Sequence, residues 1–281
     1  AYQGTPQDSG RDGLGLLPIW SRRARRSIWN VTSVSGDLAG WRSLLACVYL
    51  VDLHQYSSTE KRTAALLAAE RLVGIARCRT LRYRDQVGVR GKTRILKLDG
   101  RVAVGGSRSI TILRGQKATG IVGQIGRPAI RSGLLTETLD LEDQIRPAVR
   151  PWLSALDEHR ETWKRLLDGD IELDLNAKQL PPYLDLLAEH TGNRPLSAAE
   201  GEWLFQRIVC GQGCKDTDGQ WRPAVQAALG ERLRPLAAKE AAIGSLVAQL
   251  GKKNPRTEDG ARLNTWLEDI AALESVLGRM E

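Results

Sequence analysis

The stretch "DLAGWRSLLACVYLVD", residues 37–52, indicates that this chain folds around helices. Its apolar side chains recur at intervals of three and four residues, and Asp37 is of a type that caps helix N-termini. The longest apolar run of the chain, from Leu44 to Val51, lies inside this stretch. A membrane span needs roughly 20 apolar residues, so the stretch predicts a helix of a protein that does not cross a membrane.

The residues after this stretch predict a second helix. "RTAALLAAERLVGIARC", residues 62–78, places apolar side chains on one helical face, and the pattern predicts a helix over 59–77. Ser57 with Glu60 has the spacing of a capping box at its start. The chain has eight Trp but only one Phe and one Met, so Leu, Ala and Val must fill most of the core. This composition favours helices over a β-sandwich.

The pattern changes after residue 92. "TRILKLDGRVAV", residues 93–104, has two β-rich runs around Asp99-Gly100, which predicts a hairpin, and "GGSRSITIL", residues 105–113, can add a strand. With the two preceding helices, the hairpin suits a winged-helix-like unit. "QKATGIVGQIGRPAIRSGLL", residues 116–135, resembles a helix-turn-helix, with a helix over 116–125 and a turn at Gly126-Arg127-Pro128.

These patterns predict an α+β protein that is predominantly helical, with N-terminal helices and a β-hairpin followed by a helical bundle. Residues 1–17 are expected to form a flexible arm, 18–135 a basic domain and 136–281 an acidic helical domain. Apolar spacing predicts the helices of the last part at 138–167, 178–190, 197–209, 222–250 and 260–280.

Charge is divided unevenly between these two parts. Residues 1–135 contain 23 Lys and Arg but 8 Asp and Glu, a net charge of +15, whereas residues 136–281 carry a net charge of −7. Such asymmetry indicates that the first half meets a polyanion, and Arg side chains fork onto phosphate oxygens. The predicted nucleic-acid contacts are Arg22, Arg23, Arg25, Arg26, Arg77, Arg79, Arg82, Tyr83, Arg84, Arg90, Lys92, Arg94, Lys97, Arg127 and Arg131. Among these, Tyr83 is expected to stack on a base or sugar.

Two other interpretations of the charge remain open. The basic half can be a solvated surface, or it can dock on an acidic protein within an assembly, in which case the chain is a scaffolding subunit. The acidic residues Asp168, Asp170 and Glu172 of "DGDIELD" alternate along the chain, which keeps a metal-dependent nuclease as a third possibility. No pattern requires a cofactor, and Cys210 with Cys214 supplies only half of a zinc site.

Two stretches resemble large, poorly characterised bacterial proteins that are encoded in phage-defence and mobile-element islands. One is the Arg-Asp-x-Leu-Gly motif at Arg11-Asp12-Gly13-Leu14-Gly15, which is followed by Asn30-Val31-Thr32. The other is a Gln and Gly pattern at Gln116, Gly120, Gly123, Gly133 and Leu134. The resemblance implies a defence context and a DNA-related or complex-forming role, and it carries over no catalytic residue.

Together these features predict a non-catalytic nucleic-acid-binding subunit, with DNA expected rather than RNA and with protein partners in a larger complex. Four unevenly spaced cysteines in a chain of 281 residues indicate a reducing compartment, so the expected location is the cytoplasm.

Overall fold

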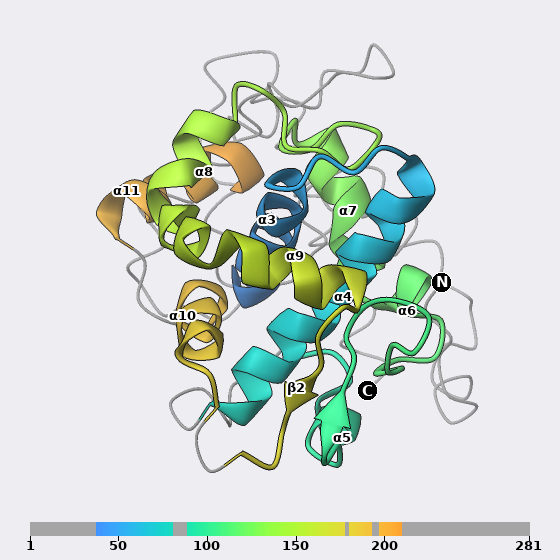
Figure 1. The fold of residues 1–281 in the computed structure, drawn as a ribbon. Helices are drawn as coiled ribbons and strands as arrows, with labels where there is room; N and C mark the ends of the chain where they lie inside the picture. Colours follow the sequence, from blue (N-terminus) through green and yellow to red (C-terminus); the bar gives the residue numbers. More distant parts are fainter. Residues whose placement is uncertain (1–37, 81–88, 178–179, 193–196, 210–281) are drawn as a thin grey trace, which may run out of the picture. The chain divides into compact units, whose positions relative to one another are not determined.

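A computed structural model describes residues 38–80, 89–177, 180–192 and 197–209 (Figure 1). The chain divides into two compact units, Val34–Glu200 and a second unit of Ala1–Ser33 with Gly201–Glu281. The first unit holds nearly all of the described residues. It is predominantly helical, with one small antiparallel sheet.

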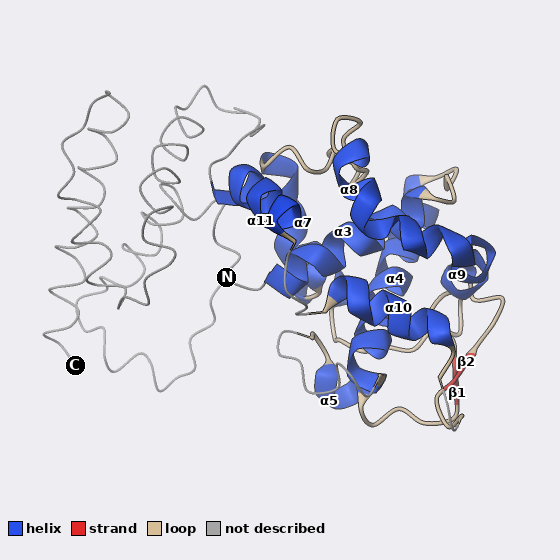
Figure 2. Ribbon diagram, turned by 90° about the vertical axis from the view of Figure 1, so that its left-hand side faces the viewer, coloured by secondary structure: helices blue, strands red, loops and turns tan. Residues whose placement is uncertain are grey.

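Two adjacent helices form the centre of this unit: α3, Leu38–Asp52, and α4, Thr59–Arg79. Every residue of α3 from 40 to 51 is buried, including the polar Arg42 and Ser43, as expected for a central helix that is mostly apolar. Both helices pack against α10, Pro182–Thr191, and Figure 2 shows the three together. The predicted helices at 37–52 and 59–77 are therefore confirmed. The cap of α4 is Ser58, whose side chain accepts from Lys61 N at 3.3 Å, instead of the expected Ser57.

Shorter helices surround the central pair. α3 also packs against α7 and α8, and α4 also packs against α5, α7 and α9. The bounds of these helices are α5 Lys92–Ile95, α6 Gln116–Thr119, α7 Ile121–Arg131, α8 Arg146–Leu153, the 3-10 helix Ser154–His159, α9 Arg160–Asp168, α11 Ala198–Leu204 and a π-helical turn at Phe205–Val209.

The predicted hairpin at 93–104 is wrong, and with it the wing of the winged-helix interpretation. Its first half is the helix α5, and its second half is β1, Arg101–Val102, which pairs with the distant β2, Leu173–Asp174. A helical turn buries Ile95 completely, whereas an isolated two-stranded hairpin is marginally stable in water. The turn at Gly100 does form, with a φ of +64°, but the strand that leaves it finds a non-local partner. Residues 105–113 form no strand.

Two further differences lie in the middle of the chain. α7 continues through the predicted turn at 126–128, because Ile121, Ile125 and Ala129 are buried along one side of it. Residues 138–145 are not helical, and an antiparallel bridge joins Leu135 to Leu141 before α8 begins.

The expected domain boundary at residue 135 falls inside the unit Val34–Glu200, in which helices from both sides of that position pack together. The predicted arm at 1–17 and the predicted helices at 222–250 and 260–280 lie outside the described residues. Within the part of the chain that the structure describes, no helix has both the length and the hydropathy of a membrane span.

Candidate nucleic-acid interface

The basic stretch, defined here as residues 90–127, is the strongest concentration of positive charge in the described chain. It contains nine Lys and Arg but a single acid, Asp99. Lys92 is partly buried, and the other eight basic side chains are exposed. These eight are Arg90, Arg94, Lys97, Arg101, Arg108, Arg114, Lys117 and Arg127. In Figure 1 much of the stretch lies at lower right, beside α4.

Close packing on α4 fixes the first part of the basic stretch. Ile95 is fully buried, and it lies so near Gly74 of α4 that a Cβ there would be 2.9 Å from Ile95 Cδ1. Gly91 begins α5 with a φ of +72°, and a Cβ on it would lie 2.7 Å from Ile112 O. Gly91 is therefore required by its positive φ and by its contact with Ile112 O, whereas Gly74 leaves room for the tip of Ile95.

Two arginines that the sequence assigned to nucleic acid serve the fold instead. Arg77 is 1% exposed and donates from Nη1 to Ser43 Oγ at 3.3 Å, so its prediction as a phosphate contact is corrected. Arg79 is partly buried, and its Nη2 donates to Ile95 O at 3.1 Å and to Leu98 O. It thereby bonds to two carbonyls at and just after the end of α5, of which Ile95 O also accepts from Leu98 N at 3.2 Å.

A buried carboxylate holds the second part of the basic stretch. Glu70 of α4 is 1% exposed; its Oε1 accepts from Ile121 N at 2.6 Å, and its Oε2 accepts from Gln116 Nε2 at 3.2 Å. Burial raises the pKa of Glu70, and the bonds from Ile121 and Gln116 oppose that shift. Since Ile121 is the first residue of α7, the carboxylate also faces the positive end of the helix dipole.

Gln116 extends this contact to the neighbouring arginine. Its Nε2 also donates to Leu67 O at 3.0 Å, and its Oε1 accepts from Arg71 Nε at 3.0 Å. Arg71 Nη1 in turn donates to Val104 O at 2.8 Å. We call Glu70, Arg71 and Gln116 the α4 clamp, because they tie three points of the basic stretch to one helix.

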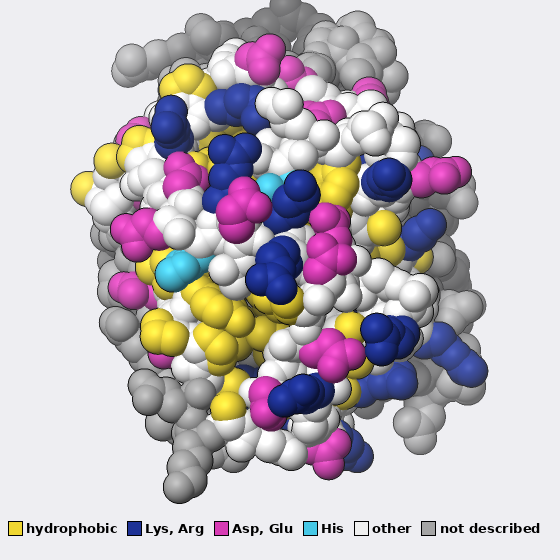
Figure 3. Space-filling model, in the orientation of Figure 1, with side chains coloured by type: hydrophobic (Ala, Val, Ile, Leu, Met, Phe, Trp, Pro, Cys, Tyr) yellow, Lys and Arg dark blue, Asp and Glu magenta, His cyan; other side chains and the backbone are white. Residues whose placement is uncertain are grey.

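The exposed cations have a different environment. None of the eight forms an ion pair with an Asp or Glu of the described residues. Arg90 donates to the neutral Gln124 Oε1 on α7, and Arg101 lies opposite Asp174 in the sheet register. Figure 3 shows Lys and Arg side chains at lower right and over α9, with Asp and Glu side chains among them in both regions. The basic stretch therefore exposes an excess of positive charge, with the exposed Asp174 beside Arg101.

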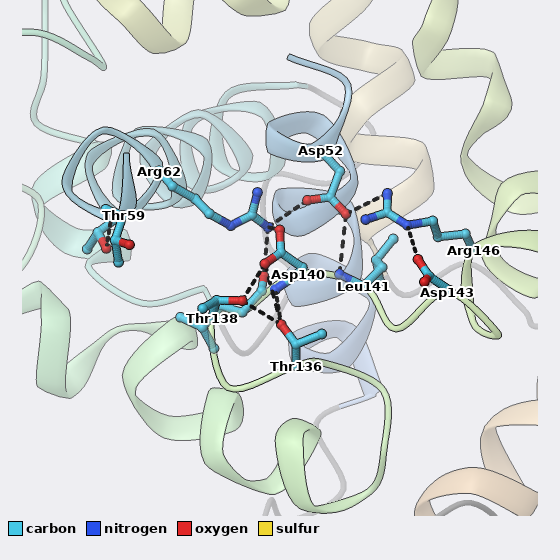
Figure 4. Close-up of polar contacts among 11 residues, drawn as sticks. Asp52, Thr59, Arg62, Thr136, Thr138, Asp140, Leu141, Asp143 and Arg146 are labelled. Carbon is cyan, nitrogen blue, oxygen red and sulfur yellow. Dashed lines mark hydrogen bonds and ion pairs between the residues drawn. The ribbon is translucent and has the colours of Figure 1, made fainter. Parts of the chain in front are cut away.

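A second arginine cluster shows the contrast (Figure 4). Arg62 Nη2 lies 2.6 Å from Asp52 Oδ1 and 2.9 Å from Asp140 Oδ1. Arg146 Nη1 lies 3.0 Å from Asp52 Oδ2. Burial raises the pKa of Asp52, and Arg62 opposes that shift more strongly than Arg146 does. These charges neutralise one another, and their ion pairs connect α3, α4 and α8, so the cluster stabilises the fold.

The acidic residues considered for a nuclease lie on the surface. Asp168, Asp170 and Glu172 are exposed, while the intervening Ile171 is partly buried and the adjacent Leu173 is 2% exposed. Nowhere in the described ranges do three or more His, Cys, Asp or Glu side chains come together as a metal would require. Asp168 ends α9 and β2 begins only at Leu173, so the three acids do not lie along one strand.

Several predicted contacts fall outside these observations. Arg22, Arg23, Arg25, Arg26, Arg82, Tyr83 and Arg84 lie outside the described residues, as do Cys210 and Cys214, and Arg131 is described only as the last residue of α7. Sequence reasoning missed the exposed Arg108, Arg114 and Lys117, which follow the predicted hairpin. The excess of basic residues over 90–127 was the signal for them.

Comparisons with protein-family models, with curated proteins and with solved structures find no match for this chain.

Proposed function

We propose that this protein is a non-catalytic nucleic-acid-binding subunit, which holds DNA through its phosphates. The observation that supports the proposal is the basic stretch, where eight exposed cations have no described acidic partner. A surface of this kind favours a ligand with closely spaced negative charges, and duplex DNA carries one phosphate charge per about 1.7 Å of its axis. We place the subunit in a prokaryotic antiviral or mobile-element complex on the resemblance of the Arg-Asp-x-Leu-Gly motif alone.

The two kinds of arginine in this unit support the same proposal. Arg71 and Arg79 are bonded to side-chain or backbone oxygens of the fold, and Arg62 is ion-paired. The arginines of the basic stretch project from short helices and turns that the α4 clamp and Gly91 hold in place. A backbone held in this way loses little conformational entropy when the side chains bind phosphates. Binding of this type is largely independent of sequence and weakens steeply with salt.

The test is fluorescence anisotropy with a labelled duplex of about 30 base pairs at several KCl concentrations between about 50 and 200 mM. The variant Arg94→Gln/Lys97→Gln/Arg114→Gln removes three exposed charges of the basic stretch. The matched control, Arg150→Gln/Lys164→Gln/Arg165→Gln, removes three exposed charges from α8 and α9. We expect the variant to reduce the slope of log K against log salt by about 3, and the control to leave it nearly unchanged.

Equal slopes for the variant and the control would contradict the proposal, and so would a wild-type protein that fails to bind duplex, single-stranded DNA or RNA at the lowest salt concentration. The scaffolding alternative predicts that second result together with salt-sensitive binding to an acidic protein partner. The nuclease alternative predicts cleavage of the labelled duplex with Mg²⁺ or Mn²⁺ and its loss on Asp170→Ala.

A further inference from the structure

α7 has one buried face and one polar face. Ile121, Ile125 and Ala129 are at most 6% exposed and pack inward. Gln124 and Arg127 are exposed and three residues apart, so they lie on the same side of the helix. The sequence of α7, IVGQIGRPAIR, contains no acidic residue. The outward face is therefore built from one amide and one guanidinium, without a charge that a phosphate would repel.

The helix is braced at its N-terminal end. α6 precedes it with only Gly120 between them, and a Cβ on Gly123 would lie 2.3 Å from Lys117 O and 2.6 Å from Ala118 O. The backbone of α6 thus crosses α7 where only a glycine fits. The buried Glu70 carboxylate holds Ile121 N from the opposite side. A helix fixed in this way can present side chains to a ligand without a large loss of freedom.

Exposed cations flank the polar face of α7. Lys117 lies on the crossing helix α6, and Arg90 reaches α7 itself by donating to Gln124 Oε1. This arrangement matches the two kinds of contact that a groove-binding helix makes. Cations at its sides bind phosphates and fix its position, while side chains along its exposed face reach base edges.

The side-chain chemistry fits the major groove of DNA. Arginine donates in a bidentate manner to guanine O6 and N7, and the glutamine amide pairs with adenine N6 and N7. An α-helix is about 10–12 Å wide with its side chains, and the major groove of B-form DNA is about 12 Å wide. The major groove of A-form RNA is too narrow and deep for side chains to read, so duplex RNA does not offer the same site.

We infer that α7 enters the major groove of B-form DNA and that Gln124 and Arg127 contact base edges there. The inference rests on the proposed function, and it adds a ligand class, the DNA duplex, together with a sequence preference. Lys117 and Arg90 hold the phosphates on either side of the groove. Arg94 and Lys97, on and just after the separate helix α5, contribute charge to binding but do not read bases.

The experiment selects duplexes from a random pool with the full chain and then measures affinity for the selected duplex, for a scrambled duplex and for duplex RNA of the selected sequence. The wild-type protein is expected to enrich a motif that contains guanine and to prefer it at least about 10-fold over the scrambled duplex, since one mismatched base pair costs about 5- to 150-fold. It is also expected to bind the RNA more weakly than either DNA.

Two double variants distinguish contacts with bases from charge attraction to phosphates. Gln124→Ala/Arg127→Ala is expected to bring the preference for the selected duplex close to one. Arg94→Ala/Lys97→Ala is expected to weaken binding to all duplexes while the preference remains. All four side chains are exposed, and circular dichroism of both variants is expected to match the wild type.

A wild-type protein that binds DNA and RNA duplexes equally, with no enriched motif, would overturn the inference and leave the proposed function standing. Retention of the preference in Gln124→Ala/Arg127→Ala would overturn it as well. Failure to bind any nucleic acid would instead overturn the proposed function on which the inference depends.

Discussion

Gly120 is the position at which one methyl group should disrupt the α4 clamp. A Cβ there would lie 2.4 Å from Glu70 Oε1, 2.5 Å from Glu70 Oε2 and 2.6 Å from Gln116 O. Its φ of −77° and ψ of −178° are open to any residue, so Gly120→Ala introduces no backbone strain. The destabilising part of the effect must therefore come from contact with the buried carboxylate and the backbone of α6.

The magnitude combines three contributions. Alanine restricts the unfolded chain and stabilises by about 0.4–1 kcal/mol. Overpacking costs about 1–3 kcal/mol, and displacement of Glu70 weakens its bond to Ile121 N, a charged hydrogen bond worth about 1.5–3 kcal/mol. We expect Gly120→Ala to lower the free energy of unfolding by about 2–4 kcal/mol.

The matched control lies in the neighbouring helix α7. At Gly126 the nearest atom to an added Cβ is Leu139 Cδ2, at an ordinary 3.4 Å, so Gly126→Ala should stabilise by up to about 1 kcal/mol through helix propensity. Urea unfolding followed by circular dichroism measures both. If Gly120→Ala proves as stable as the wild type, or if the two variants shift stability in the same direction, the close approach of Gly120 to Glu70 is refuted.

Three further predictions concern buried polar groups. Arg42 and Glu200 form a bidentate ion pair with two N–O distances of 2.9 Å, and their side chains are only about 3–4% exposed. Glu200→Gln and Arg42→Met should each lower the free energy of unfolding by about 3–5 kcal/mol in a urea titration. A decrease of less than about 1 kcal/mol would contradict the pairing. The raised pKa of Glu70 means that the folded state keeps a proton that the unfolded state releases near its ordinary value of 4.5. Wild-type stability should therefore fall relative to that of Glu70→Gln as pH rises above 4.5, and a stability difference that does not change with pH there would disprove the shift. Trp163 is fully buried and donates from Nε1 to Leu156 O at 2.7 Å. Trp163→Phe should remove that bond and lower Tm by several degrees in calorimetry, and an unchanged Tm would speak against the bond.

Local patterns in the sequence predicted the central part of the fold. The spacing of apolar residues over 37–52 and 59–77 determined α3 and α4 within two residues, because a helix that is buried on most sides needs side chains of this kind wherever its neighbours lie. The excess of basic residues over 1–135 likewise predicted a charged surface, since unpaired cations are rarely buried.

The tertiary structure alone decided which partner each segment takes. β1 pairs with β2 because Val102 and Leu173 meet across a long separation in sequence, and no local pattern around Asp99-Gly100 contains that information. Arg77 and Arg79 look like their exposed neighbours in the sequence, yet one lies in the core and the other bonds to the carbonyls of Ile95 and Leu98. An arginine side chain has the same chemistry whether it binds a phosphate or a carbonyl of its own chain. Which of the two it can reach is determined by the packing around it, here the packing of α4 against α3 and α5.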